Sequence, residues 1–213
     1  DSPISPASDT TSHQPIDDSF PRRPPAVIQL DSISYATLDV QGVGGQETAE
    51  LWFLVSASTG EKTRDGFLIQ FQLFASEGGG SLIEVSGATR GGRVVCHFKS
   101  GTTAGVCAIS AAYFDENLLA AAKSTAIRLL VNGGPPSDSN FTLVPERRNL
   151  PFKLGGQAKS TALLYDRYGN PAHSSMVYFT ASAGGMGAGG LSDSLGAVES
   201  VFKITENAAF SSG

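Results

Sequence analysis

The chain has 213 residues, of which 40% are hydrophobic and 16% charged, and its formal net charge is −5. This length allows one or two packed domains, and the 25 glycines favour a turn-rich all-β protein over a helical bundle. The acidic balance argues against a nucleic-acid partner, which selects a basic patch, and no apolar run reaches the ~20 residues that span a bilayer.

Residues 1–25 are rich in Ser, Pro, Asp and Thr and show almost no apolar periodicity. Such a segment buries too little surface to offset the entropy of ordering, so we expect a disordered, semi-extended tether. The chain starts at Asp1 with neither a Met nor an apolar signal region, which suggests a processed or trimmed N-terminus.

From Ala26 onward, short apolar runs alternate with turns. The strongest runs are 48–57 and 66–76. Their spacing predicts core strands, and the alternation within 66–76 places Phe71 and Leu73 on the core face. The other expected strands of this half are 26–30, 35–40, 81–88, 93–99, 105–114 and 125–131.

One stretch of the first half has a helical pattern. Residues 115–123 read Asp-Glu-Asn-Leu-Leu-Ala-Ala-Ala-Lys, and Asp115 is a suitable N-cap. We expect one or two helical turns there.

The two cysteines, Cys96 and Cys107, flank a turn at 99–105. In a hairpin closed by this turn they face each other, and the cross-strand Cα separation approaches the about 5.5–6 Å of a disulfide. The even count and this placement favour a Cys96–Cys107 disulfide and therefore an oxidising compartment. The alternative is two buried thiols. A zinc site is not expected, because further ligands at suitable spacing are lacking.

A strong internal boundary lies at 132–139, where Gly-Gly-Pro-Pro continues neither a strand nor a helix. We therefore predict a first sandwich at 26–133, a linker at 134–140 and a second sandwich at 141–213. The strand pattern restarts after the linker as a repeat.

The repeat is visible as short matching segments. Gly44-Gly45-Gln46 recurs as Gly155-Gly156-Gln157, and Gly105-Val106 is set against Gly196-Ala197. On this alignment the second copy lacks its final strand.

Two apolar runs of the second unit are joined by Asp166-Arg167-Tyr168-Gly169-Asn170-Pro171. Gly169 allows a positive φ, Asn170 tolerates the left-handed region, and Pro171 fixes φ and removes a donor. We predict a tight polar turn between two antiparallel core strands, with Val177 and Phe179 in the core.

This turn, together with Val177-Tyr178-Phe179-Thr180, Gly184-Gly185 and Ser194-Leu195-Gly196-Ala197, resembles the group 1 bacterial immunoglobulin-like domains. These domains occur in tandem in invasin- and intimin-type surface proteins. The resemblance covers 26–213 and implies seven-strand, two-sheet Greek-key sandwiches, with Trp52 packed in the core between the two sheets of the first. It also implies a cysteine-pair variant, which Cys96 and Cys107 fill. The location it implies is the bacterial surface, outer-membrane-associated or secreted, with an anchor such as a lipid upstream of residue 1.

Candidate catalytic sets are weak. His13, His97 and His173 have no spaced Cys, Asp or His that forms a ligand cluster. The G-x-G-x-x-G match at 185–190 precedes another turn, whereas a phosphate site needs a helix there. The acidic residues near the linker form no calcium loop. We therefore expect no cofactor, no metal and no enzymatic activity.

The predicted function is a non-catalytic structural and adhesion protein whose tandem modules act as a spacer and an interaction surface. Its expected partners are an unknown protein or glycan at a cell surface, with further immunoglobulin-like repeats C-terminal. The alternative is a carbohydrate-binding or accessory module of a secreted enzyme. That alternative needs an exposed aromatic platform, for which Tyr165, Tyr168 and Tyr178 are the only cluster.

Overall fold

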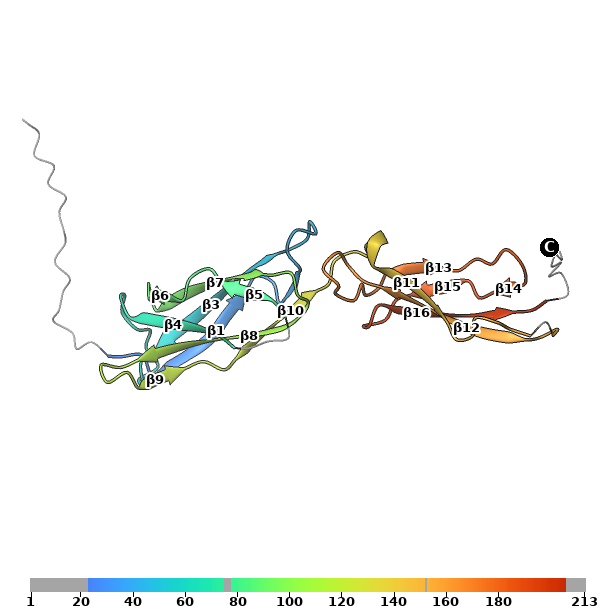
Figure 1. Cartoon of the computed structure of the whole chain (residues 1–213). Coiled ribbons are helices and arrows are strands. Elements are labelled where there is room, and N and C mark those ends of the chain that lie inside the picture. Colours follow the sequence, from blue (N-terminus) through green and yellow to red (C-terminus); the bar gives the residue numbers. More distant parts are fainter. Residues whose placement is uncertain (1–22, 75–77, 152, 206–213) are drawn as a thin grey trace, which may run out of the picture.

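The computed structural model describes residues 23–74, 78–151 and 153–205. They form two β-sandwiches that lie end to end, one after the other along the chain (Figure 1). Most of the predicted tether, residues 1–22, lies outside the described residues.

The first sandwich has two sheets. One has the order β1-β3-β7-β5, and the other β2-β10-β8-β4-β6, with β9 paired to β8. All neighbours are antiparallel except β2 and β10. The strands are β1 (Val27–Ile33), β2 (Thr37–Asp39), β3 (Thr48–Ser56), β4 (Leu68–Phe74), β5 (Gly80–Leu82), β6 (Ser86–Ala88), β7 (Arg93–Ser100), β8 (Gly105–Phe114), β9 (Ala120–Lys123) and β10 (Ile127–Asn132).

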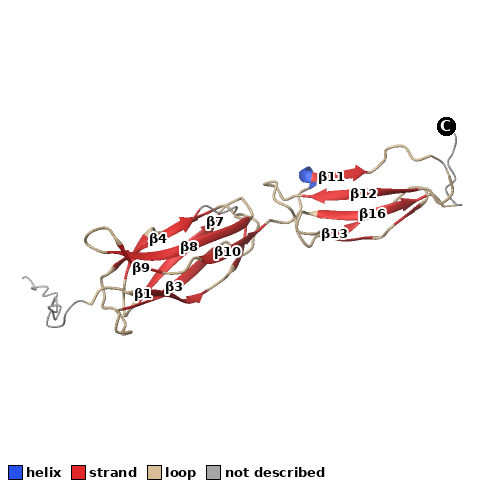
Figure 2. Ribbon diagram, turned by 90° about the horizontal axis from the view of Figure 1, so that it is seen from below, coloured by secondary structure: helices blue, strands red, loops and turns tan. Residues whose placement is uncertain are grey.

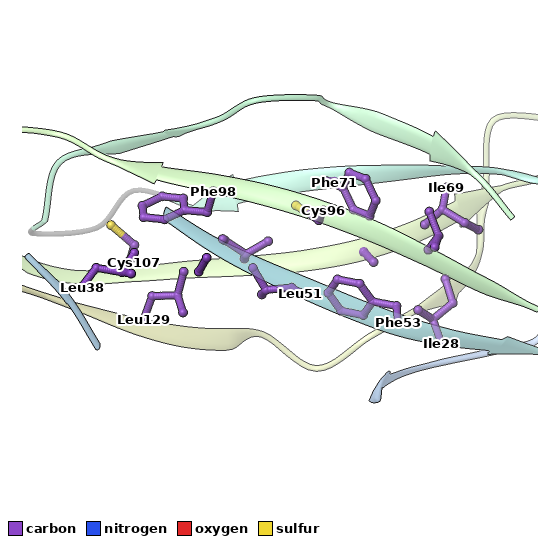
Figure 3. Packing of buried hydrophobic residues seen from close by; sticks show 14 of the residues in the cluster. Ile28, Leu38, Leu51, Phe53, Ile69, Phe71, Cys96, Phe98, Cys107 and Leu129 are labelled. Atoms are coloured by element: carbon purple, nitrogen blue, oxygen red, sulfur yellow. The ribbon is translucent and has the colours of Figure 1, made fainter. Parts of the chain in front are cut away.

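The core of this sandwich follows from the two-residue alternation of its strands. Leu51 and Phe53 of β3 are fully buried, and Phe53 stacks on Phe71 of the opposite sheet with ring centroids 6.1 Å apart. Phe71 is 4% exposed (Figure 3). Leu73 is partly buried against the same cluster.

Trp52 is not part of that core. Because its neighbours Leu51 and Phe53 point inward, the alternation of β3 places Trp52 on the outer face, where it is 37% exposed. The predicted core position of Trp52 is therefore wrong. The resemblance implied this position, and the alternation of β3 excludes it.

The predicted Cys96–Cys107 disulfide is also wrong. Strands β7 and β8 form no hairpin, because β7 pairs with β3 and β5 whereas β8 belongs to the other sheet. Both cysteines are buried thiols, and Figure 3 shows their sulfur atoms well apart, with Phe98 between them. Burial, followed by the charge of Glu84, raises the pKa of Cys96 to about 12. The Cys107 thiol donates a hydrogen bond to the carbonyl oxygen of Gly78 (3.3 Å).

The expected short helix at 115–123 is a turn followed by a strand. The carboxylate of Asp115 accepts hydrogen bonds from the N–H groups of Asn117 and Leu119, both at 2.9 Å, and this holds the turn. The next residues form β9, whose Ala122 is buried in the core. Pairing with β8 therefore overrides the helical propensity of the alanines.

The second sandwich repeats part of the first. Its larger sheet has the order β11-β12-β16-β14, and β13 pairs with β15 in the smaller one. The 3₁₀ helix η1 (Asp138–Asn140) precedes the first strand (blue in Figure 2). The strands are β11 (Phe141–Pro145), β12 (Gln157–Leu164), β13 (Met176–Tyr178), β14 (Gly185–Met186), β15 (Gly189–Leu191) and β16 (Ala197–Lys203).

The pairing shows which strands correspond. Strand β16 lies between β12 and β14 as β7 lies between β3 and β5. The sequence alignment of Gly196-Ala197 with Gly105-Val106 of β8 is therefore wrong. Among residues 141–151 and 153–205 the second sandwich has no counterpart of β8 and none of β10.

The core of the second sandwich is consequently small and open on one side. Val177 is buried, and Phe179 packs against the same cluster. Leu143 of β11 is in register with the buried Ala162, yet it is 51% exposed. By contrast, the inward-facing Ile28 of β1, the first strand of the first sandwich, is 3% exposed, because a second sheet covers it.

Candidate functional site

The turn at 166–171 lies where the two sandwiches meet. Tyr165 and Pro171 form an isolated β-bridge, and the Asp166 N–H donates to the carbonyl oxygen of Asn170 (2.8 Å). Gly169 has φ +85°, which a residue with a Cβ adopts only with strain. The segment therefore folds as a tight turn, as predicted. The strands that it joins, β12 and β13, belong to different sheets and do not pair, so the predicted pair of antiparallel strands is not a hairpin.

Asp166 holds this turn from inside. It is fully buried, and its carboxylate accepts four hydrogen bonds. The donors are the N–H groups of Tyr168 (2.8 Å), Asn170 (2.9 Å) and Gly134 (2.9 Å), and the side-chain amide of Asn170 (2.8 Å). Gly134 belongs to the connection between the sandwiches, so one carboxylate ties the turn to the linker.

The charge of Asp166 is stabilised by these donors. Burial by itself raises the pKa of the carboxyl, but the hydrogen bonds from Asn170, Gly134 and Tyr168 outweigh it and hold the pKa below its ordinary value. A buried carboxylate with a full set of N–H donors is a rigid structural element. Both of its oxygens are engaged, so it is not available to a metal ion.

Asn170 reaches across to the first sandwich. Its amide nitrogen donates to the carbonyl oxygen of Thr102, and its amide oxygen accepts from the N–H of Ala104, both at 2.8 Å. The same amide nitrogen also donates to Asp166. Asn170 is only 7% exposed, and all three contacts are made within the joint. One side chain thus connects the turn of the second sandwich to the β7–β8 connection of the first.

Arg167 and Tyr168, which follow Asp166 in the turn, make a second contact with the first sandwich. Arg167 donates to the carbonyl oxygen of Gly42 (2.7 Å), and the Tyr168 hydroxyl donates to that of Gln41 (2.9 Å). The guanidinium lies 4.7 Å from the centre of the Tyr168 ring, so each side chain steadies the other. These contacts are more exposed than those of Asn170 and are expected to contribute less.

The linker itself is closely packed. A Cβ on Gly133 would meet the carbonyl oxygen of Pro171, and one on Gly134 would meet Val43. An open groove of about 350 Å³ follows the joint, with Asp39 and His173 among its lining residues. The small side chains of the linker allow the two sandwiches to approach each other closely.

Other chemistry-bearing groups do not converge. Nδ1 of His97 lies 2.8 Å from a carboxylate oxygen of Glu84, and the ring of His173 contacts the hydroxyl of the adjacent Ser174 (2.8 Å). In the described ranges no group of three or more His, Cys, Asp or Glu side chains is placed to hold a metal ion. Nor does any helix of the described chain have the length and apolar character needed to cross a membrane.

The sequence indicated the turn but not its role as an interdomain contact. The acceptors in the first sandwich are main-chain carbonyls of Gln41, Gly42 and Thr102, and main-chain groups carry no side-chain signal. The available signal was a polar Asp-x-x-Gly-Asn-Pro turn that follows the second strand after a Gly-Pro linker.

Comparisons with known proteins identify adhesin structures. The Escherichia coli adhesin FdeC matches with a TM-score of 0.50 and 16% identity, over 84% of this chain and 55% of that chain. The D0-D1 domain of intimin gives a TM-score of 0.36 and 15% identity, over 84% of each chain. For the Yersinia pseudotuberculosis adhesin InvE these values are 0.35 and 14%, over 85% and 51%. No family model and no curated protein sequence matches.

The likeness to FdeC establishes the fold. The chain consists of immunoglobulin-like β-sandwiches of the kind found in bacterial adhesins, and the predicted fold class is confirmed. The chain spans about half the length of the FdeC and InvE structures that it matches.

Proposed function

We propose that this chain is a non-catalytic arm of a bacterial surface adhesin, in which tandem immunoglobulin-like sandwiches hold an interaction surface away from its anchor. The observation that carries the proposal is Asn170, which bonds to both sides of the joint beside the buried Asp166. A joint built this way transmits position and force between units, whereas a flexible linker does not.

The size of the contact supports a single preferred geometry. Five hydrogen bonds run from Arg167, Tyr168 and Asn170 to residues of the first sandwich. The two bonds of Asn170 contribute about 0.5–1.5 kcal/mol net each, and the three more exposed bonds of Arg167 and Tyr168 add less, before the entropy of docking is subtracted. Because the units are already joined by a short linker, that entropy is smaller than for separate molecules.

The surface location follows from the adhesin likeness as a proposal. FdeC and InvE are named as adhesins, and a low charge with abundant Gly, Ser and Thr is compatible with an extracellular β-protein. We place the partner, a protein or glycan, at a cell surface. The exposed core side of β11 gives further strands or repeats a surface to cover.

Small-angle X-ray scattering tests the arm. The parent chain is expected to scatter as a rod of two end-to-end sandwiches, with a pair-distance distribution that falls to zero at one well-defined maximum dimension. Asp166→Ala is expected to broaden that distribution while both sandwiches stay folded by circular dichroism. A parent chain that already scatters as two freely tumbling bodies would exclude the proposed rigid arm.

A further inference from the structure

The outer face of the sheet β1-β3-β7-β5 carries an exposed tryptophan in its middle. Trp52 lies on β3, an inner strand, and is in register with Ser32 of β1 and Val95 of β7. It is 37% exposed, although tryptophan has much to gain from burial. An indole at such a central position is supported by strands on both sides and presents its remaining surface to solvent.

Fixed polar groups extend from this tryptophan along the same face. The indole N–H donates to Glu50 (3.4 Å), and His97, opposite Glu50 in the register, lies with Nε2 3.8 Å from that carboxylate. Nδ1 of His97 lies 2.8 Å from Glu84, whose carboxylate also accepts the His97 main-chain N–H (2.6 Å). Contacts between successive members therefore fix the positions of the side chains in the series Trp52, Glu50, His97 and Glu84.

The charges around the tryptophan nearly cancel. Arg93, on the outward side of β7, pairs with Asp31 at 3.0 Å. The carboxylates of Glu50 and Glu84 lie 3.8 and 2.8 Å from the ring nitrogens of His97. Lys99, two residues further along β7, lies on the same outward side of the strand. Donors and acceptors of both signs thus alternate beside one aromatic surface, and no large field of a single sign is present.

We propose that this face is a carbohydrate-binding site that takes a neutral pyranose ring. The apolar C–H side of the ring stacks on the indole of Trp52, and its hydroxyls donate to the carboxylates of Glu50 and Glu84. A hydroxyl is both donor and acceptor, so it matches a mixed and nearly balanced set of groups, whereas an ionic ligand needs an uncompensated opposite charge. The site lies on the side of the arm and is separate from the joint.

The exposed neighbours define how far the contact extends. Ile83 is 62% exposed, and its N–H donates to the carbonyl oxygen of His97, so it lies beside this group of side chains. It offers apolar surface to a second sugar ring. We therefore expect oligosaccharides to bind more tightly than single rings.

The single tryptophan of the chain provides a direct readout. Indole fluorescence and the indole N–H resonance report on Trp52 alone. The probes are methyl glycosides of glucose, galactose, mannose and N-acetylglucosamine, together with cellohexaose and chitohexaose. At least one is expected to give a saturable shift, with a Kd on the order of 1 mM for a single ring and lower for the hexaose.

Variants test the assignment. Saturation-transfer NMR observes the sugar and does not need the indole, so it also follows Trp52→Ala, which is expected to weaken binding at least tenfold. Glu50→Gln and Glu84→Gln are expected to weaken it severalfold. Leu68→Ala, an exposed apolar position of the other sheet, is the matched control and is expected to leave binding unchanged.

Three results would overturn the proposal. One is that none of the six sugars moves the indole signals. Another is that Trp52→Ala binds as well as the parent chain. The third is that a tetra-arginine peptide shifts the indole resonance while every sugar fails, which would assign the face to a basic protein segment. Scattering from the joint does not depend on Trp52, so none of these results decides the rigid-arm proposal.

Discussion

Replacing Asn170 by alanine removes the side chain that connects the two sandwiches. The variant loses two hydrogen bonds across the joint, to Thr102 and Ala104, and one to Asp166 within the turn. At about 1 kcal/mol net for each neutral bond, the interdomain loss is about 2 kcal/mol. Since 1.4 kcal/mol is a factor of ten, the ratio of undocked to docked molecules is expected to rise about 30-fold.

Pulsed dipolar spectroscopy between two spin labels measures that change. Gln29→Cys on β1 and Gln157→Cys on β12 place labels on exposed strand positions, one in each sandwich. The native Cys96 is buried with its pKa raised to about 12, so it is expected to resist labelling. The parent chain should give one narrow distance distribution, and Asn170→Ala a broad one.

The control and the refuting outcome are specific. Asn117→Ala changes the same residue type in an exposed loop of the first sandwich and should leave the distribution narrow. Thermal unfolding of Asn170→Ala must still show a folded second sandwich, so that broadening reports the joint alone. If the distribution of Asn170→Ala is as narrow as that of the parent chain, the turn does not hold the joint.

Four further results are expected. Because the pKa of Asp166 is lowered in the folded state, its stabilisation is present above the ordinary carboxyl pKa of about 4 and is lost as the pH falls through the lowered value. Calorimetry should therefore show the second sandwich melting earlier as the pH falls below about 4, with a flatter pH dependence in Asp166→Asn; an equal slope in both would contradict the buried carboxylate. Gly169→Ala, at φ +85°, should destabilise that sandwich by about 1–2 kcal/mol in urea titrations, whereas Gly190→Ala, which has open space, should be nearly neutral. Alkylation of the denatured, unreduced chain should modify both thiols, as measured by intact mass. If both cysteines stay unmodified, they form a disulfide and the structure is wrong on this point. Phe53→Ala should lower the free energy of unfolding by about 3–5 kcal/mol, and Trp52→Ala should lower it much less. Equal melting temperatures for the two variants would disprove this assignment.

How much of the fold the sequence predicts depends on the range of the interactions that set it. Strand positions such as 48–57 and the turn at Gly169 depend on local alternation and backbone sterics, and both are as expected. Sheet membership depends on which strands pair, and alternation does not encode it. For this reason Cys96 and Cys107 were assigned to one hairpin although their strands lie in opposite sheets.

The tryptophan illustrates a different limit. The family resemblance implied a core position for Trp52, whereas the alternation of β3 places it on the opposite face from Leu51 and Phe53. Where the two signals conflict, the alternation prevails, because inverting the face of one residue inverts the whole strand. A tryptophan at an outward-facing strand position is then itself informative. Its apolar surface remains in contact with water, which is unfavourable, and packing within the sandwich does not explain it.

The position of the Asp-x-x-Gly-Asn-Pro turn within its unit explains why the two copies differ. The turn joins β12 to β13, and its counterpart in the first sandwich is the connection 57–67 between β3 and β4. Each connection lies at the end of its sandwich that faces the preceding part of the chain. In the second sandwich this connection contacts the first sandwich, with Asp166 bonded to the linker and Asn170 bonded to the first sandwich.

In the first sandwich the corresponding connection meets the segment that leads into β1. Arg23 bonds there to Glu61 (2.8 Å), with both side chains more than half exposed, a pair that contributes little stability. The connection that contacts another sandwich therefore has the buried carboxylate of Asp166, whereas the connection at 57–67 has only an exposed ion pair. A turn needed only to join two strands would be expected in both copies.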